Sequence, residues 1–142
     1  MDFIARLRTA PPRWLPLTAL IAGGAACAFV LQRANPYAAH GVLPRCPLHA
    51  LTGLYCPGCG SARALYSLLH GDALQAMAMN PLLVVALPLV LLMALHSAGW
   101  RPRALDPLVR VIGNPTLWLA VLAGFGVLRN VPFAPFNALA PG

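Results

Sequence analysis

Three cysteines lie close together near the middle of this 142-residue chain, in the segment CPLHALTGLYCPGCGSARALYSLLHGD. Cys56 and Cys59 have the C-x-x-C spacing of a metal knuckle, in which a tight turn points two sulfurs at one centre. Cys46 and His49 form a second pair, also separated by two residues. Together the four side chains would offer three sulfurs and one nitrogen, a donor set that suits tetrahedral zinc and that also allows iron.

The same cysteines allow two other kinds of chemistry. Cys56 and Cys59 could cycle between dithiol and disulfide, with Arg63, four residues after Cys59, favouring the thiolate. No βαβ pattern surrounds the pair, so a thioredoxin fold is not expected. A disulfide, or simply packed thiols, could instead fix the loop onto the rest of the protein. The residues alone leave metal binding, redox cycling and a static clamp open.

Two charged residues follow the cysteines. Arg63 stands beside an apolar helical stretch, where a charge must find water, a carboxylate or backbone carbonyls. Asp72 is the nearest acid, so we expect a structural pairing between the two side chains. The alternative is that Arg63 contacts an anion or a lipid headgroup.

The elements that must position these residues are expected to be membrane helices. The chain is 59% hydrophobic and only 9% charged, whereas soluble domains carry about 25% charged residues. Apolar runs near the length needed to cross a bilayer cover residues 14–31, 81–98 and 115–131. We therefore predict an all-α integral membrane protein, with residues 1–142 forming one domain of about three transmembrane helices.

Residues 33–80 lie between the first two spans. Their prolines and glycines predict a structured loop without helix as far as residue 60, followed by two short re-entrant or interfacial helices. Three sites have the pattern of a helix start: Asp72 with Gln75 three positions later, Asn80-Pro81, and Asn114-Pro115. The third span is short, so either it thins the bilayer or it extends past Arg129, whose side chain would then snorkel to the interface.

The small residues GGAA before Cys27 leave a signal-peptide or lipoprotein cleavage site open, although a retained anchor explains the same residues. All ten basic residues are arginine, and the formal net charge is +7. Nucleic-acid binding is not expected, because these arginines flank apolar runs instead of sharing one face with stacking aromatics.

The arginines near the span ends favour a cytoplasmic N-terminus and a cysteine loop on the opposite side of the membrane. One side would carry Arg6, Arg8, Arg13, Arg101, Arg103 and Arg110, and the other Arg33, Arg45, Arg63 and Arg129.

The central segment resembles an uncharacterised family of small bacterial membrane proteins, DUF2752. The residues that carry the resemblance are Cys46-Pro47, the run Thr52-Gly53-Leu54-Tyr55-Cys56-Pro57-Gly58-Cys59-Gly60, Arg63-Ala64, Gly71-Asp72, Ala76 and Asn80-Pro81. The resemblance implies a helical bacterial membrane protein and supplies no activity, and it does not support His49 as a ligand throughout the family.

We therefore expect a multi-pass protein of the bacterial inner membrane with a non-enzymatic role. Its partners would be the lipid bilayer and either other membrane proteins or further copies of itself. The alternative function is a membrane thiol-disulfide oxidoreductase that uses Cys56 and Cys59.

Overall fold

The computed structural model describes residues 12–38 and 46–140, and every regular element within these ranges is a helix. The helices in chain order are α2 (Leu15–Arg33), α3 (Pro47–Thr52), α4 (Ser61–Leu69), α5 (Ala73–Met79), α6 (Pro81–Ser97), η1 (Arg103–Leu105), α7 (Asp106–Ile112), α8 (Pro115–Leu128) and η2 (Phe136–Leu139). The prediction of a helical fold is confirmed for the described residues.

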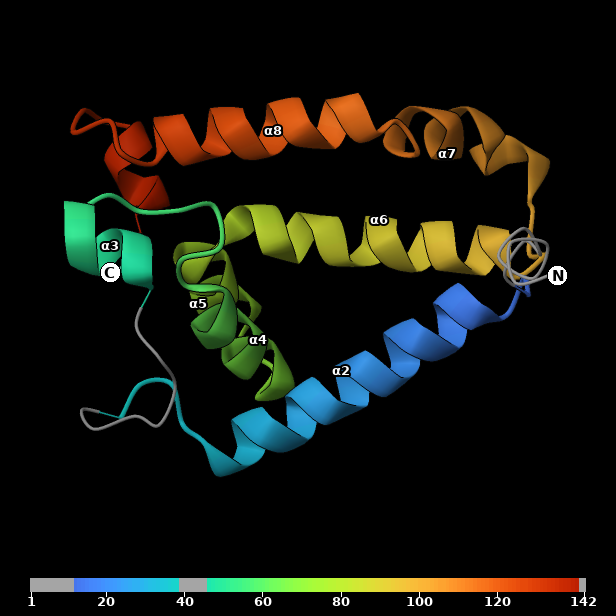
Figure 1. Ribbon diagram of the computed structural model, residues 1–142, viewed down its shortest axis with the longest axis horizontal. Coiled ribbons are helices and arrows are strands. Elements are labelled where there is room, and N and C mark those ends of the chain that lie inside the picture. The colour runs from blue at the N-terminus through green and yellow to red at the C-terminus, as the bar shows by residue number, and fades with distance from the viewer. Residues whose placement is uncertain (1–11, 39–45, 141–142) are drawn as a thin grey trace, which may run out of the picture.

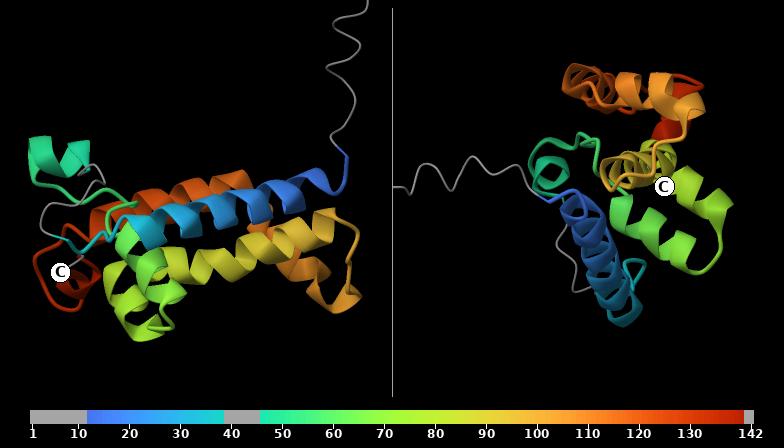
Figure 2. Two further views of the ribbon diagram at one scale, coloured as in Figure 1. Left: turned by 90° about the horizontal axis from the view of Figure 1, so that it is seen from below. Right: turned by 90° about the vertical axis from the view of Figure 1, so that its right-hand side faces the viewer.

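The long helices α2, α6 and α8 run lengthwise through the molecule, and successive ones point in opposite directions (Figure 1). Helices α3, α4 and α5 gather at one end, and η1 and α7 lie at the other. Viewed along the long axis, α4 and α5 lie to one side of α6 (Figure 2). This topology brings the cysteine segment, the start of α6 and the end of α8 to the same end of the molecule, called the cysteine end below.

Among the described residues, one helix is long and apolar enough to cross a membrane by itself: α2, with 19 residues and a mean hydropathy of 1.8. Helix α6 has 17 residues and follows α5 at a bend of 111°. Helix α8 has 14 residues and follows the η1–α7 segment at a bend of 59°. By length and composition there are up to three candidate spans, if each bent pair counts as one.

The predicted helix bounds need three corrections. Helix α8 ends at Leu128 and does not continue to residue 131. The short α7 was not predicted, although its acidic first residue and Pro107 are typical of a helix start. Helix α3 lies in a stretch that was predicted to be loop. Pro47 does not prevent this helix, because it occupies the first helical turn, where its missing N–H removes no hydrogen bond.

Of the arginines counted for orientation, Arg6, Arg8 and Arg45 lie outside the described residues.

The three helix starts predicted from side-chain caps are confirmed. The backbone N–H groups donate to the capping side-chain oxygens: Gln75 to Asp72 at 2.9 Å, Leu83 to Asn80 at 3.0 Å, and Thr116 to Asn114 at 3.0 Å. These caps fix where α5, α6 and α8 begin. The starts of α5 and α6 lie at the cysteine end, so their caps help to fix the helices there.

A small core lies at the cysteine end, where α4 and α5 pack on α6. Ala64, Ala76 and Met79 are buried there, and Leu68, Leu83 and Val84 pack against them. The small alanine side chains let the helices approach closely, so the short α4 and α5 pack tightly against the start of α6.

Candidate metal centre

The three loop cysteines converge on one point. The Sγ atoms of Cys46 and Cys56 are 3.4 Å apart, those of Cys56 and Cys59 are 3.3 Å apart, and all three lie within 4.8 Å of one another. These are contacts between free thiols, because a disulfide bond is about 2.05 Å long. Cys59 is buried, and the other two are half-buried. The fourth cysteine, Cys27, lies on α2 outside this group, which we call the thiol triad.

The geometry of the thiol triad is close to that of a metal site. Zinc–sulfur bonds of about 2.3 Å in a tetrahedron place neighbouring sulfurs about 3.8 Å apart. The two distances from Sγ of Cys56 are a few tenths of an ångström shorter than this, and the Cys46–Cys59 pair lies within 4.8 Å, so small rotations of the side chains would admit an ion. Three thiolates are also the donors that select zinc or iron over magnesium or calcium.

The structure does not bring His49 into the triad. The imidazole instead stacks on the ring of Tyr55, with centroids 4.4 Å apart and planes inclined by 15°. His49 acts through its backbone, because a hydrogen bond from it is the main reason that the pKa of Cys46 is lowered to about 7. The predicted four-residue ligand set thus reduces to three thiols in this structure.

Cys46 and Cys59 differ in their readiness to lose a proton. The pKa of Cys46 is lowered by backbone hydrogen bonding at the start of α3, first from His49, and then by the neighbouring thiols. The pKa of Cys59 is raised to about 12, first by burial and then by hydrogen bonding to Cys56 and Cys46. Without a metal, Cys46 therefore ionises near neutral pH, whereas Cys59 stays protonated.

The backbone of the C-P-G-C turn is held by Asn80, the residue that also caps α6. Its Nδ2 donates to the carbonyl oxygens of Pro57 at 3.0 Å and Cys59 at 3.3 Å, and to the hydroxyl of Ser61 at 3.1 Å. The Asn80 side chain is 1% exposed, so these bonds are shielded from water. One asparagine therefore fixes both the helix start and the cysteine turn.

Asn130, just after α8, holds the residue that precedes Cys56. Its Oδ1 accepts the backbone N–H of Tyr55 at 2.8 Å, and its Nδ2 donates to the carbonyl of Tyr55 at 2.9 Å. Close approach is permitted by Gly126, where an added Cβ would lie 3.1 Å from Cγ of Pro57. The end of α8 thus packs against and hydrogen-bonds to the turn that carries two of the three thiols.

Arg129 also holds this turn, so the alternative in which its side chain snorkels to the interface is wrong. Its side chain is 1% exposed, and its Nη1 donates to the carbonyls of Cys56, Pro57 and Cys59 at 2.9, 3.3 and 3.1 Å. The guanidinium carbon also lies over the ring of Phe125, 4.9 Å from its centroid. Sequence reasoning missed this role because the contacts span 70 to 73 positions. A lone charge at the end of an apolar run was the available signal.

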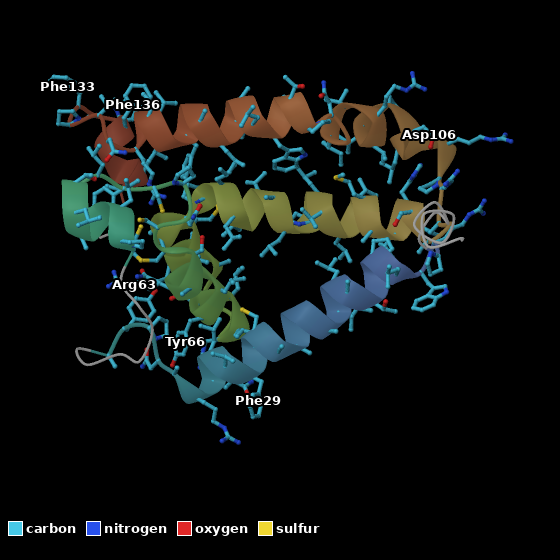
Figure 3. All side chains as sticks on the ribbon, in the orientation of Figure 1. Phe29, Arg63, Tyr66, Asp106, Phe133 and Phe136 are labelled. Carbon is cyan, nitrogen blue, oxygen red and sulfur yellow. The ribbon has the colours of Figure 1, made fainter. Side chains whose placement is uncertain are left out.

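Arg63 and Asp72 have separate contacts. The Arg63 guanidinium lies over the ring of Tyr37, 5.6 Å from its centroid, and the Asp72 carboxylate caps α5. Figure 3 shows Arg63 at the cysteine end and Asp106 at the opposite end, where Asp106 meets His96 at 3.2 Å. The pairing of Arg63 with Asp72 stays a prediction.

The described residues thus define a helical protein with three apolar long helices and a thiol triad at one end. Residues 46–94 match a family described as "Protein of unknown function (DUF2752)", which confirms the resemblance found in the motifs. The match includes the triad, α3, α4, α5 and most of α6, while Arg129 and Asn130 lie beyond it. The searches of curated proteins and of solved structures found no match.

Proposed function

We propose that this protein is an integral membrane component in which Cys46, Cys56 and Cys59 bind one metal ion, zinc or iron. The role of the ion is structural and non-enzymatic: it fastens the segment between α2 and α6 at the cysteine end. The observation that carries the proposal is the convergence of three thiols within 4.8 Å. An odd number of thiols cannot pair off as disulfides, whereas one metal ion can bind all three.

Membrane insertion is supported by the apolar surface of the long helices. Only 6% of the α2 window is buried inside the protein, although its mean hydropathy is 1.8. A surface of this kind needs a hydrocarbon solvent, and lipid supplies one. Counting each bent pair as a span gives up to three spans, and we propose a multi-pass protein of a bacterial inner membrane. Neighbouring membrane proteins, or further copies of this chain, could cover part of that surface.

The arrangement of charges supports a cysteine end on the side away from the cytoplasm. Arg13, Arg101, Arg103 and Arg110 belong to segments at the end opposite the triad. Arginines near helix ends are retained in the cytoplasm during insertion. Because Arg129 is buried against the turn, its charge adds little to the exposed charge at the cysteine end.

Metal content tests the proposal. The full chain, purified in detergent without chelators, should carry one zinc or iron per molecule by elemental analysis. Cys56→Ser and Cys59→Ser should each abolish the bound metal, because loss of one thiolate opens the site. Cys27→Ser is the matched control and should retain it, since Cys27 lies outside the triad.

Several outcomes would contradict the proposal. Protein without stoichiometric metal, or equal metal content in all three variants, would rule out a site at the triad. A reversible Cys56–Cys59 disulfide in metal-free protein would favour the oxidoreductase alternative. For the membrane assignment, release of the protein from membranes by carbonate would contradict insertion.

A further inference from the structure

We propose that Arg129 is the counter-charge of the metal centre, and that the centre is a complex of three thiolates, one divalent ion and a neutral fourth ligand. This inference rests on the proposed metal binding at the triad. It adds three things to that proposal: the charge of the metal centre, the chemical class of its fourth ligand, and the role of Arg129, which lies outside the segment that matches the family.

The first argument is the burial of a charge. Arg129 is 1% exposed, and a guanidinium stays protonated in proteins. A buried charge is strongly unfavourable unless it is paired or fully hydrogen-bonded. In the part of the chain that the structure describes, Asp72 caps α5 and Asp106 meets His96, and neither carboxylate forms an ion pair with Arg129. Its counter-charge must come from another group.

The second argument is the position of this guanidinium. Nη1 binds the carbonyls of Cys56 and Cys59, so the positive charge is fixed against the backbone of two members of the triad. Nε and Nη2 are buried and have no hydrogen-bond partner among the described residues. Carbonyl dipoles partly solvate the charge, but they do not neutralise it. Among the described residues, the acidic groups that act most strongly on this charge are the thiols of Cys59 and Cys56.

The third argument is charge balance. Three thiolates and one divalent ion leave a single negative charge, which the one positive charge of Arg129 neutralises. A neutral fourth ligand, such as water or an imidazole, preserves this balance. A fourth thiolate would leave one negative charge uncompensated in a half-buried site. Groups around metal ligands commonly change metal affinity by about 10–100-fold when they are removed.

Competition with a chromophoric zinc chelator tests the role of Arg129 in the full-length protein in detergent. Arg129→Gln should weaken the apparent zinc affinity by about 10–100-fold, because it removes the charge and most donors. Arg129→Lys keeps the charge and should weaken binding by less than about tenfold. The control is Asn130→Ala, which loosens the turn at Tyr55 but leaves the net charge unchanged, and it should resemble the lysine variant.

The outcomes separate the two proposals. If wild-type protein binds neither zinc nor iron, the metal proposal fails and this inference fails with it. If wild type binds zinc but Arg129→Gln binds equally well, or Arg129→Lys and Arg129→Gln lose the same amount, only the counter-charge role is overturned. X-ray absorption of wild-type protein loaded with zinc needs no variant to fold. Three sulfurs near 2.3 Å and one nitrogen or oxygen near 2.0 Å are expected, and four sulfurs would overturn the neutral fourth ligand.

Discussion

Asn80 should be the most sensitive single residue at the cysteine end outside the triad, because it has two structural roles. Its Oδ1 caps α6 by accepting the N–H of Leu83, and replacing such a cap by alanine costs about 1 kcal/mol. Its Nδ2 donates hydrogen bonds to the carbonyls of Pro57 and Cys59 and to the hydroxyl of Ser61. Asn80→Ala removes both sets of hydrogen bonds together.

The structure gives a magnitude for this loss. A buried polar group left without a partner costs about 1–3 kcal/mol. In this variant, the carbonyls of Pro57 and Cys59 would still accept hydrogen bonds from Nη1 of Arg129, so the lower part of this range applies. With the lost cap, we expect Asn80→Ala to lower the free energy of unfolding by about 2–3 kcal/mol.

Asn114 provides a matched control. It starts α8 with the same Asn-Pro pair and accepts the N–H of Thr116, but its side chain is exposed and holds no loop. Asn114→Ala should therefore cost only about 1 kcal/mol. Asn80→Asp separates the two roles, because a carboxylate still caps α6 but cannot donate to the turn. It should stay close to Asn80→Ala in its effect.

The assay is reversible unfolding in mixed micelles, followed by helical circular dichroism, with the free energy taken from the denaturant dependence. Maleimide reactivity of the triad gives a second reading, since loosening of the turn should expose Cys59. The reasoning would be refuted if Asn80→Ala were no more destabilising than Asn114→Ala, or if Asn80→Asp behaved like wild type.

Three further results are expected. Gly126→Ala should destabilise the protein by about 1–3 kcal/mol because its Cβ would meet Pro57 at 3.1 Å, while Gly124→Ala, with nothing within 4 Å, should change stability by less than about 1 kcal/mol in the same assay. In reduced, metal-free protein, Cys46 should be alkylated before Cys59 and should slow as the pH falls below its pKa of about 7, since the thiolate is the reactive form. Equal rates by mass spectrometry would contradict this order. An impermeant maleimide should label the triad from outside intact cells after reduction and chelation, and labelling only after the inner membrane is opened would reverse the topology.

The local features of this chain could be predicted from the sequence. Caps depend on a side chain and a backbone N–H only two or three residues away, so Asp72, Asn80 and Asn114 identified three helix starts correctly. Pro47 was misread because proline ends a helix from within but is favoured in its first turn. The same ambiguity hid α7, whose second residue is Pro107.

The long-range features could not be predicted in this way. The spacing of Cys56 and Cys59 already implies proximity, but Cys46 reaches them only because α3 turns the chain back. No local pattern shows that Arg129 and Asn130, from the end of α8, hold the backbone of residues 55–59. Equally, His49 had the right spacing for a ligand, but its ring stacks on Tyr55. Spacing gives the distance between donors, while tertiary packing decides where each side chain points.

The most direct test of the metal centre is thiol counting on one purified sample before and after treatment with a strong chelator. Thiolates bound to a metal resist alkylation, so mass spectrometry should show Cys46, Cys56 and Cys59 protected at first and alkylated after chelation. One zinc or iron per chain should be released at the same time, and the labelling of Cys27 should not change. Three triad thiols that are equally alkylated with and without chelator, in protein that releases no metal, would contradict the account.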